Sequence, residues 1–343
     1  METEFYLGAN TARGFVSHYD QLFPGRKKRL VRIIKGGAGC GKSTLMKKVA
    51  MQAEQIGLDV ERICCSSDPD SLDGVAVPQV GYALVDGTAP HVVEPMLCGS
   101  REIYLDLSGG YDVDGLRGSY GTLIELARAG QACYPRATAC LNAVASLEPL
   151  LASVPPVLTS ELAISICERE IEKRDGTGMY RTVFLSSYTP AGRQTCWKTI
   201  DRLCGKVYVL RDSAEAITTF LRAAAQIVTS RGWNCIIGDS PLVPGVYWEH
   251  LLVPEQDIAF VTSMPLSPYP GQPARILGRQ VGDEGILNMQ KVLTAEATEH
   301  LRQAKEFHDL LETTYAPFVD FSLADCAAQA CCAELVRMAE QTE

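Results

Sequence analysis

The segment VRIIKGGAGCGKSTLM, residues 31 to 46, contains the residues with the clearest chemical potential. Gly36, Gly41, Lys42 and Ser43 match the pattern G-x-x-x-x-G-K-[ST] between an apolar stretch and a helical one. In this pattern backbone N–H groups surround phosphate oxygens, the lysine reaches the β- and γ-phosphates, and the serine hydroxyl binds magnesium. We therefore expect a site for ATP and Mg²⁺ whose phosphate-binding residues are Gly36, Gly37, Ala38, Gly39, Cys40, Gly41, Lys42, Ser43 and Thr44.

A second magnesium ligand is predicted at Asp86. It follows the apolar stretch YALV in VGYALVDG, and the acidic magnesium ligand of a phosphate-loop protein usually stands at the end of such a strand. The alternative is an ordinary aspartate at the end of a strand. Gly87 and Thr88 follow, whereas motor-type ATPases generally carry a carboxylate there that orients the attacking water. Rapid hydrolysis driven from that position is not expected.

Two further groups are candidates for catalysis. Asp68, Asp70 and Asp73 lie in CCSSDPDSLDG after a predicted strand, at the end of a sheet where ligands gather. Asp68 could accept a proton from an acceptor hydroxyl, although the same letters suit a turn and a helix cap. His91 in DGTAPH could sense the γ-phosphate or protonate a leaving group; the alternative is a loop histidine with one hydrogen bond.

These residues are positioned by a plan that occurs twice in the chain. EFYLGANTARGF matches TVFLSSYTPAGR, the phosphate loop and its helix match residues 207 to 232, and two later pairs follow in the same order. The offset drifts only from about 178 to about 160, as expected after a duplication with small deletions. Each copy alternates strand and helix, which predicts an α/β fold with a parallel sheet.

The second copy keeps the shape of the first and loses its charges. Lys42 falls on Ile217, Gly41 on Ala216, and Asp86 on Thr262. An isoleucine cannot neutralise phosphate, so we expect nucleotide only in the first copy. The predicted fold is therefore a tandem of duplicated P-loop NTPase lobes.

Each predicted lobe ends in helices. Leucines at helical spacing recur over residues 141 to 151 and again, with other apolar residues, over 301 to 311, which favours an antiparallel helical pair on each lobe. The charged, glycine-bearing segment EREIEKRDGTGM suggests the boundary, giving lobes 1–178 and 179–343.

Composition narrows the class of protein. The net charge of −9 among 343 residues disfavours a nucleic-acid platform, and no apolar run is long enough to cross a membrane. The start lacks a secretion signal, so we expect a cytoplasmic protein. The 13 cysteines contain no C-x-x-C pair and suggest reduced thiols rather than a metal centre.

The combination of GGAGCGKSTLM, CSSDPDSLDG, VDGTAPH and a decayed second copy resembles a family of bacterial twin P-loop ATPases of unassigned biological role. The resemblance covers nearly the whole chain. It implies an ATP-binding fold in two lobes and no particular substrate. Members of that family can be intact at both phosphate loops, whereas the second loop here is degraded, which puts in doubt any mechanism that needs two equivalent sites.

Two functions fit these residues. In the first, slow hydrolysis at one magnesium-dependent site acts as a conformational switch for a protein partner bound through the helical extensions. In the second, the protein is a small-molecule or nucleotide kinase whose acceptor lies near the Asp68–Asp73 loop and whose helices close as a lid. A third interpretation is a purely structural scaffold. It predicts that Lys42→Ala leaves the thermal stabilisation by ATP unchanged.

Overall fold

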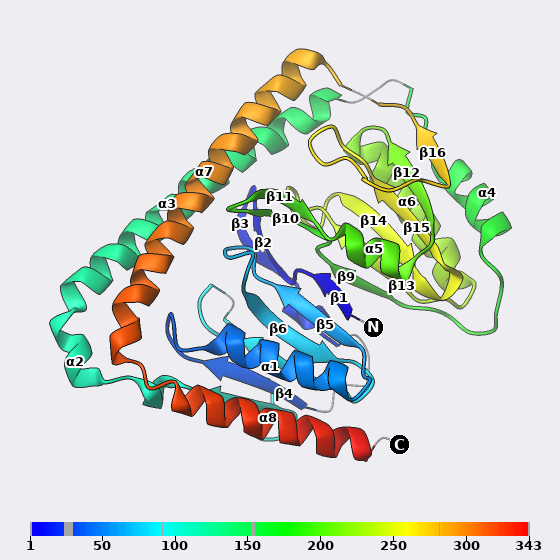
Figure 1. Cartoon of the computed structure of the whole chain (residues 1–343). Coiled ribbons are helices and arrows are strands. Elements are labelled where there is room, and N and C mark those ends of the chain that lie inside the picture. The colour runs from blue at the N-terminus through cyan, green and yellow to red at the C-terminus, as the bar shows by residue number, and fades with distance from the viewer. Residues whose placement is uncertain (1, 24–29, 91, 152–154, 281, 342–343) are drawn as a thin grey trace. The chain divides into compact units, whose positions relative to one another are not determined.

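The computed structural model describes residues 2–23, 30–90, 92–151, 155–280 and 282–341 (Figure 1). The chain divides into two compact units. The first contains residues 1–8, 19–135 and 300–343, and the second contains residues 9–18 and 136–299. Each unit therefore takes segments from both sides of residue 178, and the predicted division of the sequence at that point stays a prediction.

A six-stranded mixed sheet forms the centre of the first unit. Its strands are β1 (Glu2–Phe5), β4 (Leu30–Lys35), β5 (Val60–Cys64), β6 (Leu72–Val77), β7 (Tyr82–Asp86) and β8 (Glu102–Asp106). The strand order is β1-β5-β6-β7-β4-β8, and β6 runs antiparallel to both of its neighbours. Strands were expected near residues 30 to 35, 58 to 64 and 80 to 86, and β4, β5 and β7 confirm them.

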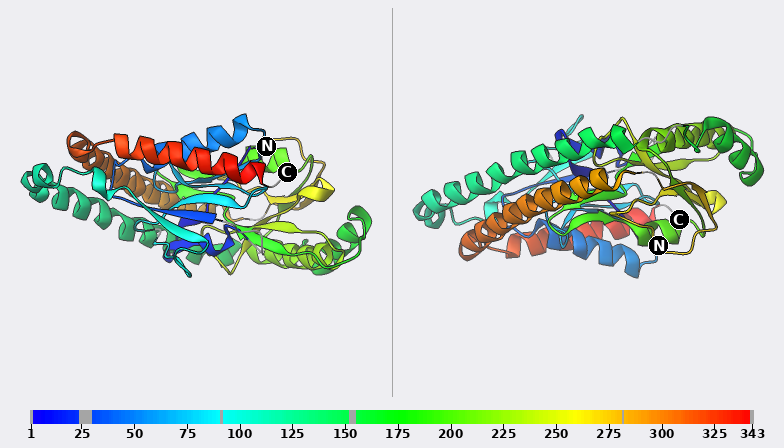
Figure 2. Two further views of the ribbon diagram at one scale, coloured as in Figure 1. Left: turned by 90° about the horizontal axis from the view of Figure 1, so that it is seen from below. Right: turned by 90° about the horizontal axis from the view of Figure 1, so that it is seen from above.

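Two helices pack side by side in the first unit, as Figures 1 and 2 show for α1 (Lys42–Gln55) and α8 (Ser322–Glu340). The apolar face of α1 presents Leu45, Met46 and Val49 to a buried cluster that includes Leu335 of α8. The short elements are η1 (Tyr19–Gln21), η2 (Ser108–Gly110), α2 (Val113–Gly118) and η5 (Ala316–Phe318). The phosphate-loop helix is thus covered by the last helix of the chain.

An ion pair also ties α8 to the sheet. The Arg32 guanidinium on β4 donates to both carboxylate oxygens of Glu334, at 3.0 and 2.5 Å. The Tyr82 hydroxyl on β7 donates to the same carboxylate at 2.9 Å. This bidentate geometry fixes the direction of α8 as well as its distance from the sheet.

The second unit has a mixed sheet of the same design. Its strands are β9 (Tyr180–Val183), β12 (Lys206–Arg211), β13 (Cys235–Asp239), β14 (Trp248–Val253), β15 (Ile258–Thr262) and β16 (Arg275–Gly278), in the order β16-β12-β15-β14-β13-β9. Its helices are α4 (Ser160–Glu170), α5 (Trp197–Leu203) and α6 (Ala214–Ser230), with η3 (Glu148–Leu151) and η4 (Pro254–Gln256). Strand for strand, order and direction match the first unit.

A small antiparallel sheet accompanies the second unit. It joins β2 (Gly8–Thr11), β3 (Gly14–Ser17), β10 (Ser186–Thr189) and β11 (Gly192–Thr195), in the order β11-β10-β2-β3. The turns at Gly14 and Gly192 share one geometry. Both glycines have positive φ, and a threonine three residues earlier donates its hydroxyl to the glycine carbonyl in each turn.

The prediction of parallel sheets is wrong in one respect, because β6 and β14 are antiparallel strands. Each returns through a short turn into the next strand, and that turn ends on a residue in the left-handed region, Gly81 with φ 68° in the first unit and Asp257 with φ 56° in the second. The segment LDGVAV was not expected to be a strand, since aspartate and glycine disfavour one. Burial of all six of its residues outweighs that propensity.

The predicted helical segments lie within two long helices, except that residues 148–151 form η3. Residues up to 135 of α3 (Tyr120–Leu147) belong to the first unit and the rest to the second, while α7 (Glu284–Tyr315) passes from the second unit into the first at residue 300. Gly130 of α3 faces Phe307 of α7 within the first unit. No helix of the described residues is long and apolar enough to cross a membrane.

Candidate nucleotide site

The phosphate loop connects β4 to α1 through residues 36–41, and four of these six residues are glycine. Gly39 and Gly41 have φ of +67° and +88°, where other residues are strained. Gly37 lies against Tyr111, since a Cβ added there would be 2.8 Å from the Tyr111 hydroxyl. The turn itself therefore requires glycine at residues 39 and 41, whereas a side chain at residue 37 would have to displace the Tyr111 hydroxyl.

Lys42 and Asp86 are brought together as the sequence predicts. The Lys42 ammonium donates to the carbonyl oxygens of Gly36 at 2.9 Å and Gly37 at 2.8 Å, and it lies 3.7 Å from a carboxylate oxygen of Asp86. Both side chains are 13% exposed. The positive charge is thus held over the loop beside the predicted magnesium ligand.

Ser43 links the loop to the neighbouring strand. Its hydroxyl oxygen accepts the backbone N–H of Leu72 at 3.0 Å, at the start of β6. Thr44, the next residue, is exposed on the first turn of α1. One lone pair of the Ser43 oxygen stays available for a metal ion, so the hydrogen bond orients the hydroxyl without blocking it.

A second acidic group adjoins Asp86. Asp73 was expected in a loop, but it lies in β6 and is 4% exposed. Burial raises the pKa of Asp73 well above its usual value, and the nearby Asp86 carboxylate raises it further, whereas hydrogen bonding with Cys65 and the charge of Lys42 lower it. Asp73 and Asp86 therefore both lie near the single ammonium group of Lys42. A divalent cation would reduce the repulsion between the two carboxyl groups.

Asp68 and Asp70 form a turn between β5 and β6. One Asp68 carboxylate oxygen accepts the Ser71 hydroxyl at 2.6 Å, and the other lies 3.4 Å from the Lys305 ammonium of α7. Burial raises the pKa of Asp68, but the Ser71 bond and the Lys305 charge outweigh it and lower the pKa overall. Asp70 is exposed, and its carbonyl accepts from Lys47 at 2.5 Å. The turn chemistry expected from DPDS is present, and Asp68 already has three partners, the third being the Asp70 N–H at 3.3 Å.

Sequence reasoning missed Glu312, which lies on the phosphate loop. Its carboxylate on α7 accepts the backbone N–H of Gly39 at 3.1 Å. His308, one turn earlier on the helix, lies 3.4 Å from the same carboxylate oxygen. The His308 hydrogen bond is the main cause that lowers the pKa of Glu312, with a smaller contribution from the Gly39 N–H. The loop therefore holds an anion supplied by its own chain.

The predicted magnesium site consists of few protein groups. Among the described residues no cluster of three or more His, Cys, Asp or Glu side chains could hold a metal ion. Magnesium in nucleotide sites is normally bound by one or two protein oxygens together with phosphate and water. Ser43 and Asp86 fit that pattern. His91, the third predicted catalytic residue, lies outside the described residues.

The second unit lacks a phosphate loop at the corresponding place. Only Asp212 and Ser213 separate β12 from α6, so helix occupies the position of the cradle. Ser213 caps the helix by accepting the N–H of Ala216 at 3.3 Å. Thr262, opposite Asp86 in the repeat, donates its hydroxyl to a buried backbone carbonyl. Ser213 and Thr262 are thus satisfied by groups of the second unit itself.

Comparison with known proteins identifies no relative: no protein-family model, curated protein or solved structure matches the chain.

Proposed function

We propose that the first unit is a P-loop NTPase domain that binds ATP with Mg²⁺ at residues 36–44, and that the two units are duplicated lobes of which only the first binds nucleotide. The shared strand order and the matching turns support the duplication. The observation that carries the nucleotide site is the Glu312 carboxylate on the N–H of Gly39, because it marks this loop as an anion acceptor.

The chain's own residues would divide the work as follows. Loop N–H groups and the start of α1 hold phosphate oxygens, and Lys42 moves from the Gly36 and Gly37 carbonyls to the β- and γ-phosphates. Ser43 and Asp86 hold Mg²⁺, which supplies charge neutralisation on the phosphates when bound. The absence of a carboxylate at residues 87 and 88 favours slow hydrolysis.

Slow hydrolysis suits a conformational switch. A phosphate oxygen on the Gly39 N–H displaces the Glu312 carboxylate, and negative charge on the nucleotide repels it. The end of α7 is then released while triphosphate is bound, and it returns when phosphate leaves. A cytoplasmic protein partner that contacts the helical extension would sense this difference.

The test is calorimetric titration of ATP and Mg²⁺ into the wild-type chain and into the Lys42→Ala variant. We expect binding of one nucleotide per chain, lost or weakened at least about tenfold without the lysine. Equal binding by both proteins would contradict the site, and a stoichiometry of two would contradict the vacant second lobe. ATP consumption is then measured with and without a pool of metabolites. Strong stimulation by an acceptor would favour the alternative, a kinase, and contradict the switch.

A further inference from the structure

The second unit contains a cavity that the proposed nucleotide site does not use. It encloses about 90 Å³ at the loop end of the sheet, between the start of α6, the ends of β12 and β15, and the helical segments around Glu148 and Gln290. A water molecule needs about 10–15 Å³ of such space, so the cavity has room for a compact organic molecule. Its lining is mostly apolar, with Ile217, Leu242 and Met264 among the residues.

An anionic ligand is disfavoured because the protein already places carboxylates there. Asp212 lines the cavity, where one of its carboxylate oxygens accepts the Ser213 N–H at 2.8 Å and the other accepts the N–H groups of Val157 at 2.7 Å and Leu158 at 3.0 Å. The Asp212 carboxylate thus accepts the backbone N–H groups to which a phosphate would otherwise bind.

The cavity also contains one matched ion pair. Arg193 donates to Glu249 at 2.6 Å, with side chains 9% and 4% exposed, and Ser240 donates to the other Glu249 oxygen at 3.1 Å. Glu249 thus matches the charge of Arg193, so this pair adds no net charge to the cavity.

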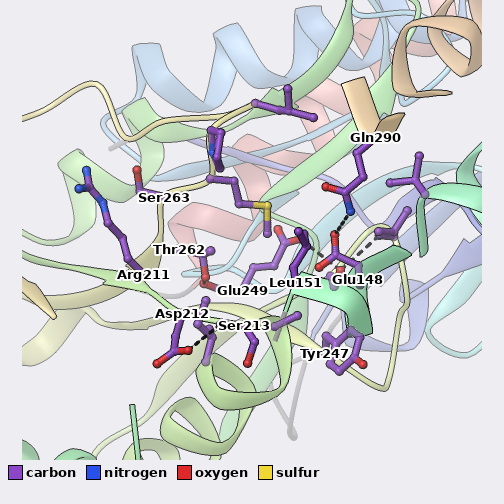
Figure 3. Close-up of a pocket in the computed structure, with 18 of the residues that line it drawn as sticks. Glu148, Leu151, Arg211, Asp212, Ser213, Tyr247, Glu249, Thr262, Ser263 and Gln290 are labelled. Atoms are coloured by element: carbon purple, nitrogen blue, oxygen red, sulfur yellow. Dashed lines mark hydrogen bonds between the residues drawn. The ribbon is translucent and has the colours of Figure 1, made fainter. Parts of the chain in front are cut away.

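Glu148 is the carboxyl group whose charge the protein leaves unmatched. It accepts one hydrogen bond, from the neutral amide of Gln290 at 2.8 Å, and it forms no ion pair with any described residue. Figure 3 shows these two side chains facing each other, on the opposite side of the view from Arg211. Burial raises the pKa of Glu148 and the Glu249 charge adds to this effect, whereas the Gln290 hydrogen bond and the charge of Arg193 offset it only in part.

We propose that this cavity binds a small organic ammonium compound, with its apolar body against Ile217, Leu242 and Met264 and its ammonium group on the Glu148 carboxylate. Such a ligand supplies the charge that the site lacks, and the apolar lining accommodates the rest of the molecule. All residues that line the cavity belong to the second unit, and none of them belongs to the proposed nucleotide site.

The test uses three probes of nearly equal shape and different charge: benzylamine, benzyl alcohol and benzoate. Ligand-detected NMR titrations of the full chain at pH 7 should give the tightest binding for benzylamine, about tenfold tighter than benzyl alcohol, with benzoate weakest. Benzoate binding as tightly as benzylamine, or no binding by any of the three, would overturn the proposal. This comparison needs only the wild-type protein.

The Glu148→Gln variant then locates the ammonium group. It should reduce benzylamine affinity to about that of benzyl alcohol, since the amide keeps the shape and removes the charge. Glu168→Gln is the matched control, because Glu168 is exposed on α4 and does not line the cavity. Circular dichroism checks that both variants fold. Unchanged benzylamine binding in a folded Glu148→Gln protein would place the amine elsewhere and refute the assignment.

Discussion

Replacing Glu312 with glutamine should make the phosphate loop bind nucleotide more tightly. The amide still reaches the Gly39 N–H but carries no charge, so it competes less with phosphate. A hydrogen bond to a charged group contributes about 1.5–3 kcal/mol. Because the Glu312 side chain is 45% exposed, solvent screening lowers this figure to about 1 kcal/mol. That free energy corresponds to about fivefold tighter binding, and repulsion of the triphosphate raises the gain toward tenfold.

The assay is calorimetric titration with a non-hydrolysable ATP analogue and Mg²⁺. Glu306→Gln is the matched control, since Glu306 lies on the same helix, pairs with Arg302 and is 58% exposed. It should leave affinity unchanged. Raising the salt concentration should narrow the difference between wild type and Glu312→Gln, because screening weakens repulsion in the wild type. Equal or weaker binding by Glu312→Gln at low salt would refute the idea that this carboxylate competes for the loop.

Two predictions concern stability. Burial and the Arg193 charge lower the pKa of His250 to about 3, so this histidine is neutral in the folded protein and gains a proton on unfolding below about pH 6.5. Its contribution is present above pH 6.5 and is lost as pH falls towards 3; between pH 7 and 5 the loss is about 2 kcal/mol. Urea denaturation of wild type and His250→Asn should show that the variant lacks this part of the pH dependence, and parallel curves would contradict it. Gly41→Ala should lower the free energy of unfolding by about 1–2 kcal/mol because of its left-handed backbone, whereas Gly121→Ala, in open space on α3, should not destabilise the protein.

Local sequence patterns suffice to predict the glycine-rich turn and the neighbouring aspartate, whereas their role in nucleotide binding stays a prediction. The glycine spacing from Gly36 to Ser43 indicates the loop, and the apolar strand before Asp86 indicates that residue. Because β4 and β7 are parallel neighbours, the loop after β4 begins beside Asp86 at the end of β7, and the structure places the Lys42 ammonium 3.7 Å from Asp86. These signals are readable because each depends on a short stretch of chain with a backbone requirement of its own.

The missed features depend on contacts between distant segments. Glu312 reaches a loop 273 residues away, and nothing in its helix distinguishes it from the other exposed glutamates. Asp73 was assigned to a loop because its neighbours favour turns, and only burial between two strands makes that segment β6. Glu148 also lacks a local signal, because only the fold shows that it lines a cavity and that its hydrogen-bond partner, Gln290, is a neutral amide from a distant segment.

The place of α8 in the first unit affects how the protein is made. Leu45 and Met46 of α1 share a buried cluster with Leu335 of α8, which follows every residue of the second unit in the chain. On a ribosome α8 therefore emerges after the whole of the second unit, and until then the part of α1 that contacts α8 stays uncovered. The packing of the first unit is completed after that of the second, which reverses the usual order of cotranslational assembly.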